Sequence, residues 1–439
     1  MLIRYSALLL FVLASLIPAA EIKDYSSVST AIQKRVGHRL TPVVPAHSTE
    51  SRIPPEVTVE DGLTEDEAVA LALWNNAALR ATLANLGLAQ ADLKEAGLLV
   101  NPSFQLLFPI AVKPFEFLLT APIQALWERP KRLAAARLTL EGVAQQLVQN
   151  GLDLVRDVRL AHADYAATSA QAGSAGMLAT VTEEIAALNQ KRLDAGDISE
   201  LDLQLIRLEA LSTRDQAAQL EQETSVAWER LRLLSGLPAL ASPVPPQGVE
   251  SASEPAAAID ALLELASKSR PDLRAAELAV EAAGNRLGWE RSRTFALVAP
   301  LLSSKEVGGS GTKTGPGLTA ELPIFNRGQG RISRVEAEIE QLALRYAALR
   351  VQIESETTAA ATRLKQAVAA LDRMRQRLLP AAEQAVRLAE KAYENGDISY
   401  LDLQTARRPF LDLQLREGAA AAAARRAKAE LDRAVGRNL

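Results

Sequence analysis

Cysteine is absent from this sequence, and histidine, methionine and aromatic residues are rare. The 439 residues include three His and three Met, and only 4 % of them are aromatic. Without cysteine the chain forms no disulfide and carries no lipid on an amino-terminal cysteine. So few soft ligands argue against a clustered metal site, and we expect no metal ion or other cofactor.

A strong charge of one sign is absent as well. The formal net charge is -4 and the isoelectric point is about 5.7. No run of Lys and Arg offers a phosphate-binding stripe, so we expect no nucleic-acid partner. The glycine-rich stretch GGSGTKTGPG, residues 308–317, lacks the spacing and the following helix of a phosphate-binding loop. We find no catalytic constellation and expect that the protein is not an enzyme.

The first twenty residues have the pattern of a secretory signal. Arg4 precedes an apolar run from Ala7 to Ile17, and small residues follow it. The run is shorter than the roughly 20 residues that cross a bilayer as a helix. We predict export with cleavage near Ala19 or Ala20, and an exported, cysteine-free, alanine-rich chain suggests a bacterial envelope.

The rest of the chain repeats one plan. GDISELDLQ begins at Gly196 and GDISYLDLQ begins at Gly396, so eight of nine residues match at a spacing of 200. Further short matches occur in the same order in both halves. The predicted division is a signal peptide at 1–20, an extended segment at 21–60, a first repeat at 61–236, a proline-rich linker at 237–255 and a second repeat at 256–439.

The sequence pattern of each repeat predicts a helix, a β-hairpin, a very long helix and a return helix, in that order. In the first repeat we expect the helix at 64–97 and, from alternating apolar residues, the hairpin at about 102–123. Apolar residues at steps of three, four and seven then predict a coiled-coil-like helix over 130–194, roughly 100 Å long. A return helix follows at 199–235.

The second repeat predicts the same order. Its hairpin lies at about 294–325, with strands of about nine residues at 294–302 and 317–325 and a glycine-rich loop between them. Its long helix covers 332–394 and its return helix covers 399–435. Helices this long must pack along one another, so the predicted fold is mainly α with a small β part.

The repeated phrase predicts a helical turn. Gly196 and Gly396 suit a left-handed C-cap, where a residue without Cβ is favoured. Ser199 lies three residues before Asp202, which is the spacing of a capping box, and the second copy repeats this spacing. Each copy is therefore expected to end a long helix, reverse the chain and begin the return helix.

Taken together, these motifs resemble the TolC-like outer-membrane efflux proteins. The matching stretches are the duplicated GDIS.LDLQ, the opening GLTEDEAVALALWNNAALR, the segment LTAELPIFNRGQGRI after the second hairpin, and LLSGLP at the end of the first repeat. The resemblance covers about residues 61–436.

The resemblance implies a homotrimer that forms a helical barrel, with four short strands per chain in a shared twelve-stranded β-barrel. It implies a passive exit duct in the outer membrane, in contact with membrane lipid, whose helical part crosses the periplasm. The implied partners are a periplasmic adaptor protein and an inner-membrane transporter. The exported substrate stays open.

The resemblance also assigns residues to roles at the two turns. It implies adaptor-docking tips at Gly196, Asp197, Ser199, Leu201, Asp202, Gly396, Asp397, Ser399, Leu401 and Asp402. It implies a pore constriction at Asp202, Tyr393 and Asp402.

The sequence departs from the family pattern beside the second turn. Ile398 stands where some members carry an arginine, and Thr405 stands where they carry a second acid of the ring. A closed-state ionic lock is therefore absent or built differently. The hairpins are short and lack Trp and Tyr, which leaves an alternative open. In that alternative the protein is a periplasmic helical scaffold whose hairpins form no membrane-spanning barrel.

Overall fold

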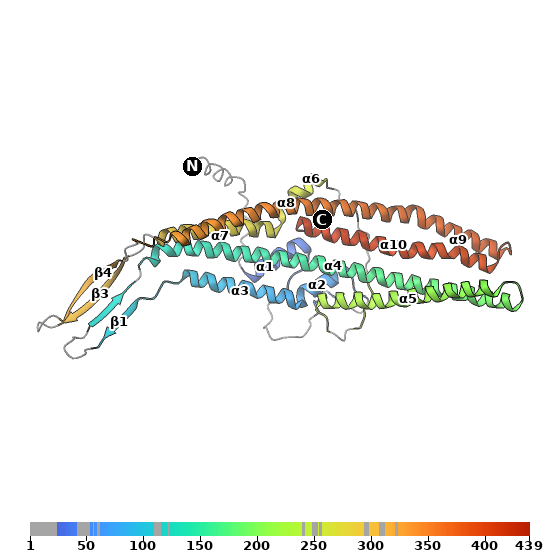
Figure 1. The fold of residues 1–439 in the computed structure, drawn as a ribbon, viewed down its shortest axis with the longest axis horizontal. Helices are drawn as coiled ribbons and strands as arrows, with labels where there is room; N and C mark the ends of the chain where they lie inside the picture. Colours follow the sequence, from blue (N-terminus) through green and yellow to red (C-terminus); the bar gives the residue numbers. More distant parts are fainter. Residues whose placement is uncertain are drawn as a thin grey trace. The chain divides into compact units, whose positions relative to one another are not determined.

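The fold is described from a computed structural model of the chain (Figure 1). It describes residues 24–41, 53–55, 57–58, 62–108, 116–121, 123–238, 242–247, 253, 257–293, 298–306, 312–320 and 324–439. The predicted signal peptide at 1–20 lies outside these residues. The chain forms two compact units, one around 82–148 and 271–349 and the other around 32–81, 149–270 and 350–439.

The first unit joins parts of four helices to one sheet. The helices are α3 (Ala77–Gly97), α7 (Pro271–Arg293) and the beginnings of α4 (Ala125–Asp194) and α8 (Gln329–Arg373). Arg129 of α4 donates to the carbonyl of Gly97 at 2.7 Å, and Arg132 donates to the carbonyl of Ala96 at 2.9 Å. Guanidinium groups thus satisfy carbonyls that the last turn of α3 leaves without helical partners.

The sheet has four antiparallel strands in the order β1-β2-β3-β4. The strands are β1 (Ser103–Leu107), β2 (Glu116–Thr120), β3 (Val298–Glu306) and β4 (Thr312–Ala320). The hairpins of the two repeats meet where β2 pairs with β3, with Leu119 opposite Leu302. One sheet therefore draws two strands from each repeat.

Two of the predicted strand positions are wrong. The second hairpin was expected to have strands at 294–302 and 317–325, whereas β3 and β4 cover 298–306 and 312–320. Part of the glycine-rich stretch that predicted a loop is paired in the ladder, with Lys305 opposite Lys313. Backbone hydrogen bonds join strands whatever their side chains, so a stretch without apolar residues still extends the ladder.

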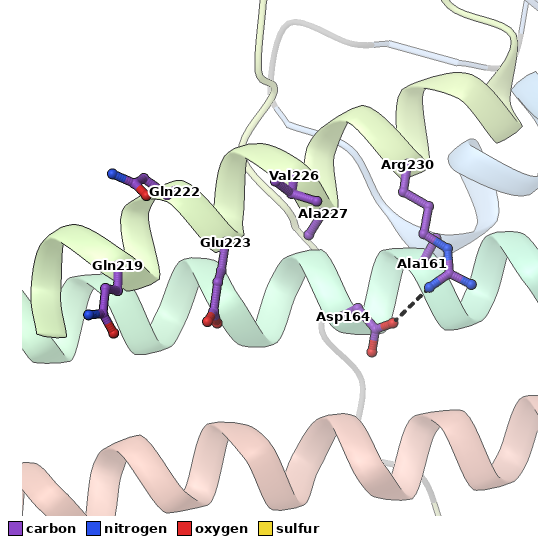
Figure 2. Close-up of a pocket in the computed structure, with 8 residues that line it drawn as sticks. All are labelled: Ala161, Asp164, Gln219, Gln222, Glu223, Val226, Ala227 and Arg230. Carbon is purple, nitrogen blue, oxygen red and sulfur yellow. Dashed lines mark ion pairs between the residues drawn. The ribbon is translucent and has the colours of Figure 1, made fainter.

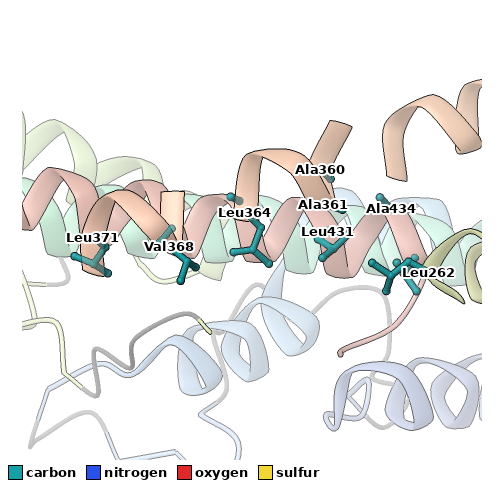
Figure 3. Close-up of a cluster of buried hydrophobic side chains, with 11 residues drawn as sticks. Leu262, Ala360, Ala361, Leu364, Val368, Leu371, Leu431 and Ala434 are labelled. Atoms are coloured by element: carbon teal, nitrogen blue, oxygen red, sulfur yellow. The ribbon is translucent and has the colours of Figure 1, made fainter. Parts of the chain in front are cut away.

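The second unit consists of helices. It contains α2 (Glu65–Asn75), α5 (Glu200–Ser235), α6 (Ile259–Ser269), α9 (Leu379–Glu394), α10 (Tyr400–Val435) and the ends of α4 and α8. Leucine and alanine form a core between α6, α8 and α10, seen in Figure 3. Its members include Leu262, Leu364 and Leu431, each at most 1 % exposed. Alanine on facing helices allows the close approach that long paired helices need.

Two helices differ from their predicted form. The helix expected at 64–97 is divided at Asn76, whose side chain accepts from the Leu79 N–H at 2.9 Å and so caps α3. The helix expected at 332–394 contains a π-helical turn, η1 (Met374–Leu378), just before Pro380. A π turn absorbs the steric conflict that proline creates inside an α-helix.

The segment expected to be extended at 21–60 contains α1 (Tyr25–Val36). The Asn438 N–H donates to the carbonyl of Arg35 at 2.9 Å, and its side-chain amide donates to the carbonyl of Val36 at 3.1 Å. The last turn of α1 is thus bonded to the end of the chain. Such a long-range partner has no local signal in the sequence.

A buried histidine ties the linker to α4. His162 is 1 % exposed, and its Nε2 lies 2.9 Å from the carbonyl oxygen of Leu63. Leu63 in turn exchanges backbone hydrogen bonds with Pro245 and Gln247 of the linker. Burial lowers the pKa of His162 below its ordinary value, so the neutral ring donates to Leu63.

We expect acidification to destabilise the second unit through His162. Because the pKa of His162 is lower in the folded chain than the ordinary value of about 6.5, its stabilising contribution is complete above that pH. The contribution is lost as the pH falls through the lowered folded-state pKa. His162→Gln keeps a donor for Leu63, so its thermal unfolding midpoint should vary less than that of the unaltered protein between about pH 7 and pH 5. Equal pH dependence in the two proteins would contradict the assignment.

Candidate functional site: the two helical turns

The first turn joins α4 to α5 through two adjoining caps. Gly196 has a φ of 81°, and the N–H of Asp197 donates to the carbonyl of Arg192 at 2.8 Å, which closes α4. The Ser199 hydroxyl accepts from the Asp202 N–H at 3.1 Å. The Asp202 carboxylate accepts from the Ser199 N–H at 3.3 Å and from its hydroxyl at 2.7 Å. The predicted capping box is confirmed.

The second turn has the same geometry. Gly396 has a φ of 81°, and Ser399 and Asp402 form a capping box before α10. Hydrogen bonds from the side chain and backbone of Ser399, in that order, lower the pKa of Asp402 below its ordinary value. Asp402 is therefore a carboxylate at neutral pH. The chain thus reverses direction at two helical turns of matching geometry, and both turns are negatively charged.

The structure brings the predicted site residues together within each turn. Leu201 is 68 % exposed, and Asp197, Asp202, Asp397 and Asp402 are exposed as well. Within the described residues, no hydrogen bond or ion pair joins 196–202 to 396–402. The assignment of these residues to docking and constriction stays a prediction, while their exposure leaves them accessible to other groups.

Tyr393 lies beside a tyrosine that sequence reasoning missed. Its ring is 5.7 Å from that of Tyr400, measured between centroids. The Tyr400 hydroxyl donates to the Glu184 carboxylate of α4 at 2.7 Å, and the Gln404 amide lies 3.5 Å from the same oxygen. The bond to Glu184 raises the pKa of Tyr400. Tyr400 and Glu184 thus link the second turn to the long helix of the first repeat.

A signal for Tyr400 was present in the sequence. It occupies the one position at which the repeated phrase differs, since the first copy has Glu200 there. A second link runs from Arg408 of α10 to Glu209 of α5. Neither partner could be identified from the sequence, because each pair joins residues about two hundred positions apart.

A hollow of about 580 Å³ lies beside α4 and α5, away from the turns (Figure 2). Ala161 and Ala227 leave room for it. Asp164 at its wall accepts from Arg426 at 2.6 Å and lies 3.7 Å from Arg230. Both carboxylate oxygens thus face guanidinium groups, so the charge of Asp164 is engaged in ion pairs.

The described residues hold no group of three or more His, Asp or Glu side chains placed to bind a metal ion. Among the described helices, none is both long enough and apolar enough to cross a membrane.

Comparison with known proteins agrees with these features. A sequence profile described as Outer membrane efflux protein matches residues 262–437. The chain is 26 % identical over 388 residues to the "Cobalt-zinc-cadmium resistance protein CzcC" of Cupriavidus metallidurans, covering 85 % of this chain and 90 % of that protein. A solved membrane protein from Pseudomonas aeruginosa has a TM-score of 0.68 at 20 % identity, covering 90 % of this chain and 98 % of its own. For the Campylobacter jejuni CmeC outer membrane channel the TM-score is 0.69 at 15 % identity, with coverages of 89 % and 90 %.

Residues 262–437 thus match the outer membrane efflux protein family, and most of the chain aligns with CzcC. The resemblance inferred from the duplicated turns is confirmed, and with it the location of this efflux protein in the outer membrane. Members of the family are efflux channels and not enzymes. In general they act as trimers with adaptor and inner-membrane pump partners. The solved structures share the mainly helical fold with few strands.

We predict that the Tyr400 hydroxyl steadies the second turn of the efflux protein. Tyr400→Phe removes its bond to Glu184 but keeps the ring beside Tyr393. Losing one hydrogen bond of about 0.5–1.5 kcal/mol should speed amide exchange at 396–404 by about two- to tenfold. Hydrogen–deuterium exchange with mass spectrometry measures this, and residues 196–204 report on the unaffected turn. Tyr393→Phe is the matched control and should change neither segment. Unchanged exchange in Tyr400→Phe would show that the bond does not steady the turn.

Proposed function

We propose that this protein is the passive, homotrimeric outer-membrane duct of a tripartite export system. In this proposal an inner-membrane transporter supplies energy and selects the cargo, and a periplasmic adaptor connects that transporter to the duct. The chain itself performs no catalysis. The observation that carries the proposal is a sheet that is apolar on one face and has two open edges.

The faces of the sheet differ in polarity. Side chains alternate along a strand, and the register places Phe104, Leu119 and Leu302 on one face. Phe117 lies on this face with its ring 6.1 Å from that of Phe104, and Leu318 extends the face on β4. The exposed fraction is 63 % for Phe104 and 67 % for Leu318. The opposite face is mixed, with Gln105, Glu116 and Ser303 beside Leu107, Leu118 and Leu301. An exposed apolar face suits lipid, and the face that carries the polar groups suits a water-filled lumen.

The two edge strands of the sheet are open to pairing with further strands. Among the strands that the structure describes, β1 and β4 each have one neighbour only. An unpaired edge presents free N–H and C=O groups, which closure into a barrel satisfies. Pairing β4 of one copy with β1 of the next is a head-to-tail contact that closes a ring, and three copies supply twelve strands.

In this proposal the two turns form the periplasmic mouth. Gly196, Ser199 and Leu201, with their counterparts in the second repeat, present a rigid docking surface to the adaptor. Asp202 and Asp402 lie at the rim of the pore, and Tyr393 belongs to the same constriction. Their capping boxes support the assignment because they fix the carboxylates without neutralising them.

We propose divalent transition-metal cations as the cargo. The relative CzcC carries cobalt, zinc and cadmium resistance in its name, and it aligns with 85 % of this chain. The turns contain Asp194, Asp197 and Glu200 beside Asp202, while Glu394 and Asp397 precede Asp402. Negative groups around an opening raise the local concentration of cations.

The short strands of the first hairpin favour a second candidate. β1 and β2 have five residues each, whereas a strand that crosses a bilayer needs about 9–11. A periplasmic helical scaffold would need no longer strands. The two candidates differ in extraction, because salt or alkali without detergent releases a scaffold, whereas a membrane-spanning duct requires detergent.

We expect the charge of Asp202 and Asp402 to control ion selectivity. In planar bilayers the unaltered protein should give stepwise, cation-selective conductance. Asp202→Lys with Asp402→Lys should lower the cation-to-anion permeability ratio at least about twofold, measured as the reversal potential in a salt gradient. Asp202→Asn with Asp402→Asn keeps side chains that cap helices and should give an intermediate ratio. Unchanged selectivity in both variants would remove these residues from the constriction, and a complete lack of conductance would count against the duct.

The cargo assignment predicts a metal-specific phenotype in the native host. Deleting the gene should lower the tolerated zinc, cobalt or cadmium concentration severalfold and raise cell-associated metal, measured by mass spectrometry. Tolerance of uncharged drugs should stay the same. Unaltered metal tolerance with lowered drug tolerance would leave the duct in place and overturn the choice of cargo.

A further inference from the structure

Equivalent residues of the two return helices differ in exposure. Leu411 of α10 is 9 % exposed, whereas its repeat counterpart Leu211 of α5 is 69 % exposed. Gln404 is 1 % exposed, and its counterpart Gln204 is exposed. The residue types are the same at both positions, so a difference in neighbours explains the contrast. α10 is covered along a face that α5 leaves open.

The helix that covers this face of α10 is α4. Tyr400 and Gln404 of α10 reach Glu184 of α4, as described above. Farther from the turn, the Gln171 amide of α4 donates to the carbonyl of Leu415 at 3.4 Å. The Leu415 side chain packs against the small cluster that contains Ala175. These contacts fix the register in which a return helix lies along a long helix of the other repeat.

The second repeat offers a long helix that lacks such a cover. The stretch of α9 around residue 384 is the repeat counterpart of α4 around residue 184. Leu388 there is 60 % exposed, and Leu378 is 49 % exposed whereas its counterpart Leu178 is 8 % exposed. The chain therefore has two uncovered faces, one on α5 and one on η1 and α9. The repeat counterparts of these faces, on α10 and α4, pack against each other inside the chain.

We infer that the uncovered face of α5 binds η1 and α9 of a second copy of this chain, in the register that joins α10 to α4 inside one chain. The inference rests on the proposed homotrimer and specifies which residues meet at its seams. Because the two faces differ, the contact is head-to-tail, and three such contacts close a ring. Within that ring, contacts inside a chain alternate with contacts between chains.

This register pairs Glu200 with Gln384 of the neighbouring copy. They are the repeat counterparts of Tyr400 and Glu184. Both are exposed, and the described residues of the single chain offer neither a hydrogen bond. Inside the chain a hydroxyl on the turn donates to a carboxylate on the long helix. Between copies the roles are exchanged, since the Gln384 amide on the long helix donates to the Glu200 carboxylate on the turn.

The same register brings opposite charges together higher on the helices. The counterparts of Leu415 and Ala175 are Asp215 and Arg375. An apolar contact inside the chain thus becomes an ion pair between copies. Asp215 is exposed and accepts from Gln219 at 2.8 Å, which leaves its other oxygen for a second donor. Arg375 donates to Glu417 through Nε at 2.7 Å, so Asp215 of the neighbouring copy would join an ion pair that Arg375 already makes.

Cross-linking tests the inference, and the cysteine-free chain makes the test specific. Glu200→Cys with Gln384→Cys, treated with a short bis-maleimide in isolated outer membranes, should give products of two and three copies on a denaturing gel. Glu184→Cys with Tyr400→Cys is the matched control, and because it joins residues of one chain it should migrate as a single copy. Glu200→Cys alone should also stay a single copy.

The outcomes separate this inference from the proposed function. A trimer by native mass spectrometry in which the Glu200→Cys and Gln384→Cys pair yields only single copies would overturn the seam and leave the duct intact. A monomer that gives no conductance would overturn the proposed function itself. Multi-copy products from the control pair would also contradict the inference, because they would show that the register inside one chain was wrongly assigned.

A charge exchange tests the second pair in a trimer that still assembles. Asp215→Arg should lower the concentration of detergent at which half the trimer dissociates, since it faces Arg375 with a like charge. Adding Arg375→Asp brings opposite charges together again. The double variant should therefore associate about two- to fivefold more strongly than Asp215→Arg alone, which is the range of an exposed ion pair. Failure of the double variant to exceed both single variants would place Asp215 away from Arg375.

Discussion

The chain contains two equivalent helical hairpins, and within one chain only one face of each can pack against the other hairpin. The covered pair lies between α4 and α10, and the other pair, on α5 and on η1 with α9, stays open. This constraint links the sequence repeat to assembly. The sheet obeys it as well, since the two hairpins share the β2 and β3 boundary and leave β1 and β4 as edges.

The two turns show how a shared local design carries different long-range contacts. Each has a glycine with positive φ, a serine cap and an aspartate that completes the box. These features are set by neighbouring residues, so both copies fold alike. Position 200 and its counterpart 400 lie just inside the following helices, where a change of side chain leaves the turn unaltered. That freedom allows Tyr400 and its bond to Glu184 at one turn and an acid, Glu200, at the other.

Local rules predicted the parts of this fold that depend on local contacts. The capping boxes, the return helices and the existence of very long helices followed from spacing and periodicity. The same rules missed the cap at Asn76, whose side chain also donates to the carbonyl of Leu234 at 3.0 Å, 158 positions away. They missed η1 because a proline by itself signals a kink or a helix break, whereas a π turn is rare and has no signal of its own in the sequence. The strand bounds failed because backbone pairing, not side-chain alternation, extends β3 and β4. At the turns, the residues were found but the Tyr400 partner was not.

The single difference between the two copies of the repeated phrase has a consequence for symmetry. A ring of six identical hairpins would have six equivalent joints, and any force on one would be shared equally among all. In the ring that we propose, Tyr400 at one joint and Glu200 at the next give two kinds of joint in alternation. Joints inside a chain close with a phenol and a carboxylate, and joints between chains would close with an amide and a carboxylate. The proposed ring would therefore be threefold rather than sixfold at its joints, and its two sets of joints could open under different conditions.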